Sequence, residues 1–283
     1  MSHRDLRALI AVGIVLALAG LWQPQNPFAI GILGAHAPPS LIHGLGTDHL
    51  GRDILSRLML GAGHTVVVLA TVGAISYLLG IAVGVIAATC GGMIEALLLR
   101  AAEFLVVMPG LVLALAITAL FGLNPVSAGV ALGLAGAGPY ALVTHGLAIR
   151  LRAMPFARAA LALGASPIRM AFVHVLPNCA AAMRTYLASD AGRNVVHYAA
   201  LSFLGLGADA ASPDWGAMLY EYRLFIFDRP ELMLWPGLAI TLTALALNLL
   251  IEPDADAAGR PRSGKAQTLL LLAPQRKHKA EPK

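Results

Sequence analysis

The chain consists of long apolar blocks separated by short polar segments, and this layout constrains its fold more than any other feature. The hydrocarbon layer of a membrane is about 30 Å thick, so a helix that crosses it needs about 20 mostly apolar residues. Lipid offers no hydrogen bonds to the backbone, so such a segment must be helical. We therefore predict an all-α membrane protein with about six transmembrane helices, at approximately Leu6–Trp22, Thr65–Thr89, Ala96–Phe121, Ser127–Ile149, Arg184–Leu206 and Leu232–Ile251.

The composition excludes several other classes of protein. Charged residues make up 12% of the 283-residue chain, about half the share of a typical soluble domain, which excludes a water-soluble enzyme. The basic residues are not interleaved with aromatic ones, which argues against nucleic-acid binding. Cys90 and Cys179 are far apart, so we expect neither a disulfide framework nor a thiolate metal site. No cofactor is expected, and no GxxxxGK[ST] loop is present to bind ATP.

The distribution of basic residues predicts how the chain is oriented. If the N-terminus is cytoplasmic, only Arg52, Arg57, Arg223 and Arg229 of the 20 Lys and Arg residues fall in loops on the opposite side. Lys/Arg bias in short loops sets orientation, so we expect both termini to be cytoplasmic and lipid to surround the helices. The first apolar block also fits a cleaved secretory signal peptide, and this alternative stays open.

The stretch from Arg150 to Arg184, which joins the fourth block to the fifth, holds five Arg and no acidic residue. Within it, Gly164 is expected to stop a helix that begins near Arg158. Ser166 and Pro167 are expected to cap a second helix that runs until Pro177. The result is a helix-turn-helix on the cytoplasmic side, able to dock into a groove on a soluble partner.

The fifth block carries a polar stripe that is a candidate translocation path. Asp190, Arg193 and His197 share one helical face, and Asn194 lies beside it. Polar groups inside a membrane helix mark pathways by default, and Asp190 and His197 could also bind a divalent metal. The alternative is an internal Asp190–Arg193 pair that fixes packing.

Three smaller patterns have structural interpretations. In the stretch Gly46–Arg57, the alternating Asp and Arg side chains are expected to pair with one another. Glu95, Arg100 and Glu103 share one stripe and are expected to lock the helix ends together. Pro109 is expected to kink the third transmembrane helix.

The cytoplasmic stretch resembles the "EAA" loop of the permease subunits of binding-protein-dependent ABC importers. That pattern is Glu-Ala-Ala, three residues, Gly, and later Leu-Pro-Asn. The resemblance implies that this stretch couples the chain to ATPase subunits. It departs from the pattern at Arg158, where the family has an acid. The coupling residues that it indicates are Arg158, Ala159, Ala160, Gly164, Ala165, Ser166, Pro177 and Asn178.

Two further motifs resemble the dipeptide, oligopeptide and nickel permeases within that family, from about residue 44 to residue 250. They are Gly46–Arg57 and the set Ser202–Gly207, Pro213–Gly216 and Trp235–Ala239. This resemblance implies a non-enzymatic subunit of a bacterial inner-membrane importer. Its partners would be a second permease subunit, two cytoplasmic ATP-binding subunits and a periplasmic solute-binding protein.

The solute is left open between peptides, which dominate the family, and nickel or a metal chelate. A secondary transporter driven by an ion gradient is the alternative of another class, but the two halves show no convincing repeat. We expect an N-terminal helix and periplasmic segment over residues 1–63 and a transmembrane core over 64–251. The cytoplasmic tail, residues 252–283, departs from the family and is expected to be disordered.

Overall fold

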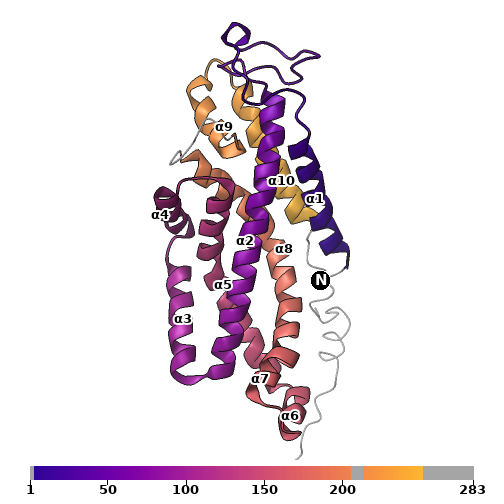
Figure 1. Cartoon of the computed structure of the whole chain (residues 1–283), viewed down its shortest axis with the longest axis vertical. Coiled ribbons are helices and arrows are strands. Elements are labelled where there is room, and N and C mark those ends of the chain that lie inside the picture. Colours follow the sequence, from indigo (N-terminus) through magenta and orange to yellow (C-terminus); the bar gives the residue numbers. More distant parts are fainter. Residues whose placement is uncertain (1–2, 205–212, 251–283) are drawn as a thin grey trace, which may run out of the picture. The chain divides into compact units, whose positions relative to one another are not determined.

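The computed structural model describes residues 3–204 and 213–250 (Figure 1). These residues belong to one compact unit, Met1–Ile251. The expected tail, residues 252–283, lies outside the described residues, as does the glycine-rich end of the Ser202–Gly207 motif.

Every regular element in the described ranges is helical, which confirms the all-α prediction. The elements are α1 (His3–Leu21), the 3₁₀ helix η1 (Ile32–Gly34), α2 (Ile54–Cys90), α3 (Gly92–Val107), α4 (Gly110–Phe121), α5 (Pro125–Ala153), α6 (Pro155–Ala162), α7 (Pro167–Arg169), the π-helix η2 (Met170–Val175), α8 (Leu176–Phe203), α9 (Trp215–Tyr222), the 3₁₀ helix η3 (Arg223–Phe225) and α10 (Glu231–Leu250).

Three of the described helices, α2, α5 and α10, are long and apolar enough to cross a membrane. The bent pair of α3 and α4 makes a fourth if it counts as one span. The searched part of α1 is shorter, and α8 carries several charged side chains. Six transmembrane helices therefore stay a prediction, of which up to four are supported by length and composition.

The third apolar block is not one kinked helix, and this prediction was wrong. Instead α3 and α4 are separate helices with a bend of 92° between them. Met108 is extended, with φ −67° and ψ 132°, and Pro109 precedes the first residue of α4. A proline disfavours helical conformation in the residue before it and has no N–H to donate, so the helix breaks instead of bending.

α2 begins eleven residues before the block we predicted, because Asp53 caps it. The Asp53 carboxylate accepts a hydrogen bond from the backbone N–H of Ser56 at 2.8 Å. Such a cap satisfies one of the N–H groups that a helix start leaves free. The resulting helix has 37 residues, so its two ends lie in separate parts of the molecule.

Among the described helices, α2 and α5 share the most extensive interface. The two helices approach closely at Gly80, where an added Cβ would lie 2.2 Å from the Cβ of Tyr140. The Ser76 hydroxyl also donates to the carbonyl of Gly133 on α5 at 2.9 Å. Helices in membranes associate through small residues and interhelical hydrogen bonds, so α2 and α5 form the frame on which the other helices pack.

Candidate functional site

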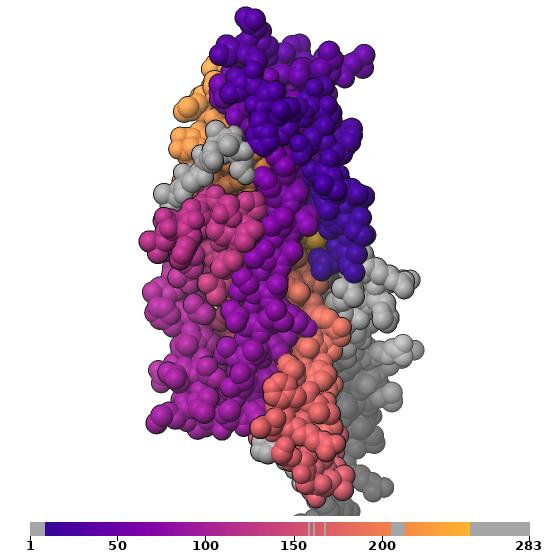
Figure 2. Space-filling model, in the orientation of Figure 1, coloured from indigo at the N-terminus to yellow at the C-terminus, as the bar shows by residue number. Residues whose placement is uncertain are grey.

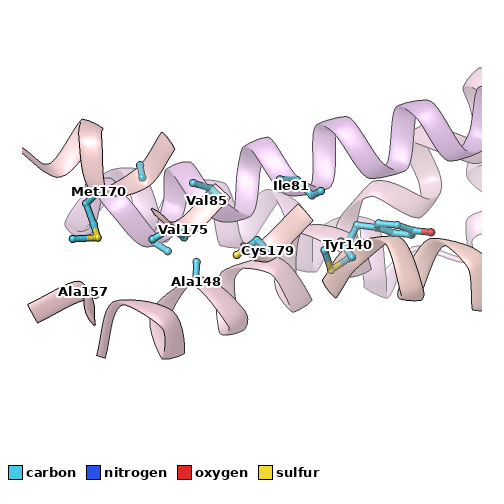
Figure 3. Packing of buried hydrophobic residues seen from close by; sticks show 11 residues of the cluster. Ile81, Val85, Tyr140, Ala148, Ala157, Met170, Val175 and Cys179 are labelled. Atoms are coloured by element: carbon cyan, nitrogen blue, oxygen red, sulfur yellow. The ribbon is translucent and has the colours of Figure 1, made fainter. Parts of the chain in front are cut away.

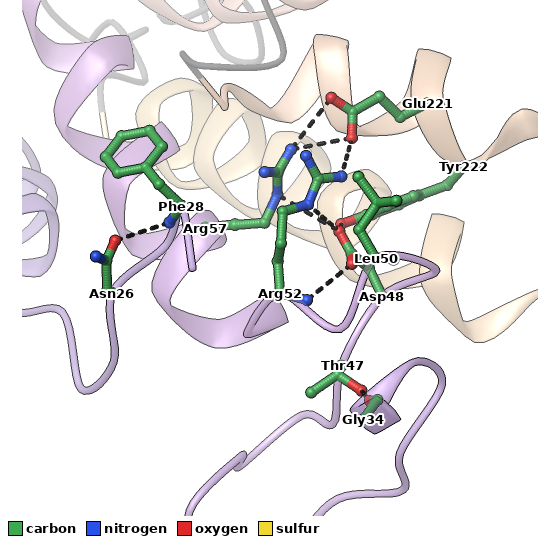
Figure 4. Close-up of polar contacts among 10 residues, drawn as sticks. All are labelled: Asn26, Phe28, Gly34, Thr47, Asp48, Leu50, Arg52, Arg57, Glu221 and Tyr222. Carbon is green, nitrogen blue, oxygen red and sulfur yellow. Dashed lines mark hydrogen bonds and ion pairs between the residues drawn. The ribbon is translucent and has the colours of Figure 1, made fainter. Parts of the chain in front are cut away.

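A buried cluster of charged side chains joins the start of α2 to α9 (Figure 4). We call it the clamp, and its members are Asp48, Arg52, Arg57, Glu221 and Tyr222. The Arg52 guanidinium donates to Asp48 Oδ2 at 2.7 Å and to Glu221 Oε2 at 2.5 Å. Arg57 Nη2 donates to the same Glu221 oxygen at 3.1 Å, and the Tyr222 hydroxyl donates to Asp48 Oδ2 at 3.3 Å. Two cations and two anions therefore neutralise one another in a site that is largely shielded from solvent.

Burial is nearly complete in the clamp. Asp48, Arg57 and Tyr222 have no exposed surface, and the side chain of Glu221 is 16% exposed. Burial alone lowers the pKa of Arg52, but Asp48 and Glu221 outweigh this effect and raise the pKa above its usual value. The Arg52 guanidinium therefore stays protonated at neutral pH.

The predicted pairing within Gly46–Arg57 is confirmed for Asp48 and Arg52. The second anion, Glu221, was missed, because it follows Arg52 by 169 positions in the sequence. Its sequence signal is weak, since it is one acid among several in the segment before α10.

Of the polar residues predicted to lie on or beside one face of α8, Asp190 contacts Arg193 and Asn194. Arg193 Nη2 lies 2.5 Å from Asp190 Oδ1. The other Asp190 oxygen accepts a hydrogen bond from Asn194 at 3.3 Å and one from the Tyr140 hydroxyl of α5 at 3.4 Å. Asp190 therefore points into the protein, and the internal pair that we kept as an alternative is present.

His197 lies one turn beyond this group and is half-buried. Among the residues that the structure describes, no group of three His, Cys, Asp or Glu side chains is arranged to hold a metal ion. Binding of a metal by Asp190 and His197 stays a prediction.

The stretch that follows α5 folds back on itself at Gly164. We call residues 155–175 the elbow. Gly164 has φ +84°, a left-handed conformation, and the N–H of Ala165 donates to the carbonyl of Ala160 at 3.0 Å. The N–H of Leu163 donates to the carbonyl of Ala159 at 3.0 Å. A glycine at this position with a bond spanning six residues is the usual way to end a helix.

The second half of the elbow begins at Ser166. Its hydroxyl accepts a hydrogen bond from the N–H of Arg169 at 3.2 Å, and Pro167 occupies the first helical position. Proline fits there because the first turn needs no donor.

The second helix does not end at Pro177, and this prediction was wrong. The chain continues from α7 through the π-helix η2 directly into α8. The N–H of Leu176 reaches back five residues to the carbonyl of Ala171, which gives the wide turn of a π-helix. Pro177 then lies at the start of α8, where its missing N–H costs little. The Asn178 side chain donates to the carbonyl of His174 at 2.6 Å.

One side of the elbow packs against the far ends of α2 and α5. Ala157 and Val175 have no exposed surface, and they join a cluster with Val85 of α2 and Ala148 of α5 (Figure 3). Figure 2 shows the elbow at the opposite end of α2 from residues 22–53.

The elbow also carries large apolar side chains that are exposed. Leu163 is 89% exposed, Ile168 70% and Phe172 65%. Exposed apolar side chains outside the apolar blocks are typical of a surface for contacts with a protein or a membrane.

Two further contacts hold the helix ends near the elbow. Glu95 does not pair with Arg100, as its stripe had suggested, but binds His145 of α5 at 2.7 Å. The Arg100–Glu103 contact is 4.0 Å long and exposed. Arg152 donates to the carbonyl of Ala88, where a cation complements the negative end of α2. Glu95 therefore fixes α3 to α5, and no sequence pattern had indicated His145 as its partner.

Comparison with known proteins shows which family this chain is part of. Residues 80–252 match the model of "Binding-protein-dependent transport system inner membrane component". The chain belongs to this family. It is the permease subunit of an ABC importer, a membrane component and not a catalytic subunit, as the "EAA" resemblance predicted.

The names of similar curated proteins refer to different solutes. The nickel transport system permease protein NikC of Escherichia coli (strain K12) is 33% identical, with 88% of this chain and 91% of that protein covered. A putative peptide transport system permease protein of Brucella abortus biovar 1 is 34% identical, with 88% and 86% covered. The probable D,D-dipeptide transport system permease protein DdpC of E. coli is 30% identical, with 91% and 87% covered.

Proposed function

We propose that this permease forms a heterodimer with a second permease subunit in the bacterial inner membrane. In this proposal it crosses the membrane six times, with both termini in the cytoplasm and the clamp on the periplasmic side. A periplasmic binding protein delivers the solute, and two cytoplasmic ATP-binding subunits supply the energy. The orientation is supported by the arginines around the elbow, because basic loops stay in the cytoplasm.

The elbow is the proposed coupling element, and its combination of buried and exposed apolar side chains is the observation that carries the proposal. Val175 and Ala157 fix it to α2 and α5, so a movement of the elbow is passed to the frame of the molecule. Leu163, Ile168 and Phe172 are left exposed for the ATP-binding subunits. ATP binding would then favour one of two conformations through its different contacts with each.

The proposed solutes are peptides, with nickel or a metal chelate as the second candidate. Peptide and dipeptide permeases are among the similar proteins, and this class supports the first choice. The second is favoured by the similarity to NikC and by Asp190 and His197 on α8.

The test is uptake of a labelled dipeptide and of labelled nickel by the source cell, with and without this gene. Loss of dipeptide uptake alone supports the first choice. Loss of nickel uptake alone replaces it with the second, and loss of neither contradicts both. Co-purification of an ATPase with the tagged chain separates this mechanism from transport driven by an ion gradient, which needs no such partner.

A further inference from the structure

One face of α8 is not covered by the rest of the described chain, and a charge lies in its middle. Ser189, Arg193, Val196 and Phe203 are exposed at helical spacing. The Arg193 side chain is 58% exposed, whereas that of its partner Asp190 is 8% exposed. A charged group inside a membrane helix does not face lipid cheaply, so this face lies against protein or water.

The ion pair of α8 is therefore asymmetric. Both oxygens of Asp190 already have partners, and these partners come from α8 and α5. Arg193 reaches Asp190 through Nη2. A guanidinium has five N–H donors, so most of its hydrogen-bonding capacity is still available on the exposed side.

The charge that this face presents is therefore positive. A planar guanidinium binds carboxylates well because its parallel N–H groups match the two carboxylate oxygens. The same charge repels a bare divalent cation. The described residues also offer no group of three metal-ligating side chains that would compensate for this repulsion.

We propose that Arg193 is a specificity-determining residue of the translocation path, which favours solutes with a free carboxylate and disfavours free divalent cations. The inference rests on the proposed function, because it needs α8 to line the path. Asp190 has the supporting role of holding the guanidinium in place.

The experiment uses cells that contain the complete transporter and measures uptake of a labelled dipeptide with a free carboxylate. Arg193→Lys keeps the charge but loses the planar fork. The double variant Asp190→Asn/Arg193→Gln keeps the shapes and a hydrogen bond between the side chains, but removes both charges. Membrane levels of every variant are measured, so that loss of protein is not mistaken for loss of transport.

Specificity and packing predict opposite results for the uncharged double variant. If Arg193 attracts the carboxylate, Arg193→Lys retains most uptake and the uncharged double variant loses about tenfold or more. If the pair only fixes packing, the uncharged double variant transports normally, and that result overturns the proposal. Arg184→Gln is the matched control and should transport like the wild type, because Arg184 is exposed on the same helix without an ion pair in the described chain.

Failure of the proposed function is visible separately, in the strain that lacks the gene. If that strain takes up the dipeptide normally but loses nickel uptake, the peptide assignment fails before any variant is made. Nickel uptake that is then unchanged or reduced in Arg193→Gln would also overturn the role of Arg193, since removing the positive charge should increase it.

Discussion

The two ends of α2 are held by opposite kinds of interaction. At its start, Asp48, Arg52, Arg57 and Glu221 form buried ion pairs. At its far end, the elbow packs through small apolar groups such as Ala157 and includes a π-helical turn. Ion pairs without solvent permit one arrangement, because moving either partner leaves a bare charge. Apolar contacts do not depend on direction in this way. We therefore expect the start of α2 to stay fixed and its far end to move during coupling.

The largest expected effect comes from breaking the clamp with Asp48→Asn. The substitution removes one of the two anions that Arg52 contacts directly and leaves the cluster with excess positive charge. Loss of one partner of a buried ion pair typically costs about 3–5 kcal/mol of folding free energy. We expect a large fall in the thermal stability of the purified subunit and in its level in the membrane.

Glu231→Gln is the control for that substitution. Glu231 pairs with Arg229 at 3.6 Å, but both side chains are about half exposed. Exposed pairs contribute about 0–1 kcal/mol, so stability should hardly change. Equal effects of the two substitutions would show that the clamp is not the fixed end described above.

At the other end, Gly164→Val should abolish transport while leaving membrane insertion intact. Nothing lies within 4 Å of a Cβ placed on Gly164, so the side chain has room. The penalty is the left-handed backbone, which costs a β-branched residue about 1–3 kcal/mol and favours another shape of the elbow. Uptake and membrane fractionation measure the two properties separately.

Gly146→Ala provides the comparison for Gly164. A Cβ on Gly146 also meets nothing within 4 Å, but its φ is not positive, so transport should continue. Gly164→Asn should be intermediate, because asparagine tolerates the left-handed region better than valine. Normal uptake by Gly164→Val would contradict the coupling role of the elbow.

The sequence and the structure agree most closely where neighbours in the chain determine the conformation. Gly164 and Ser166 act through residues within six positions, and Asp48 pairs with Arg52 four positions away. The interactions that sequence reasoning missed join distant residues: Glu221 to Arg52, and His145 to Glu95. Such pairs depend on how helices pack, which hydrophobic periodicity does not specify. The break at Met108 was underestimated because a proline inside an apolar block can either bend a helix or end it.

The double substitution Leu163→Ala/Ile168→Ala should affect assembly with the ATPase more than it affects the stability of the subunit. Both side chains are exposed, so their removal should leave the stability of the isolated subunit nearly unchanged. If the ATP-binding subunits cover them, co-purification of the ATPase should fall. Leu33→Ala/Leu41→Ala is the matched control, since these leucines are fully exposed in residues 22–53. An equal loss of ATPase with both pairs would argue against the elbow as the docking surface.

The smallest expected effect is a pH dependence that arises next to the clamp. The His49 ring stacks on Phe225, with ring centroids 4.9 Å apart, and burial lowers its pKa from the usual 6.5. Asp48 and Glu221 oppose this shift, while Arg52 and His36 add to it. Well above pH 6.5 the ring is neutral in both folded and unfolded chains, so it contributes no pH dependence there. As the pH falls below 6.5, the unfolded chain takes up the proton first, and the folded state loses stability relative to it. Thermal unfolding at pH 7.5 and pH 5 should therefore show a decrease that is smaller in His49→Gln. An undiminished decrease in that variant would assign the pH dependence to another group and leave the clamp insensitive to its neighbouring histidine.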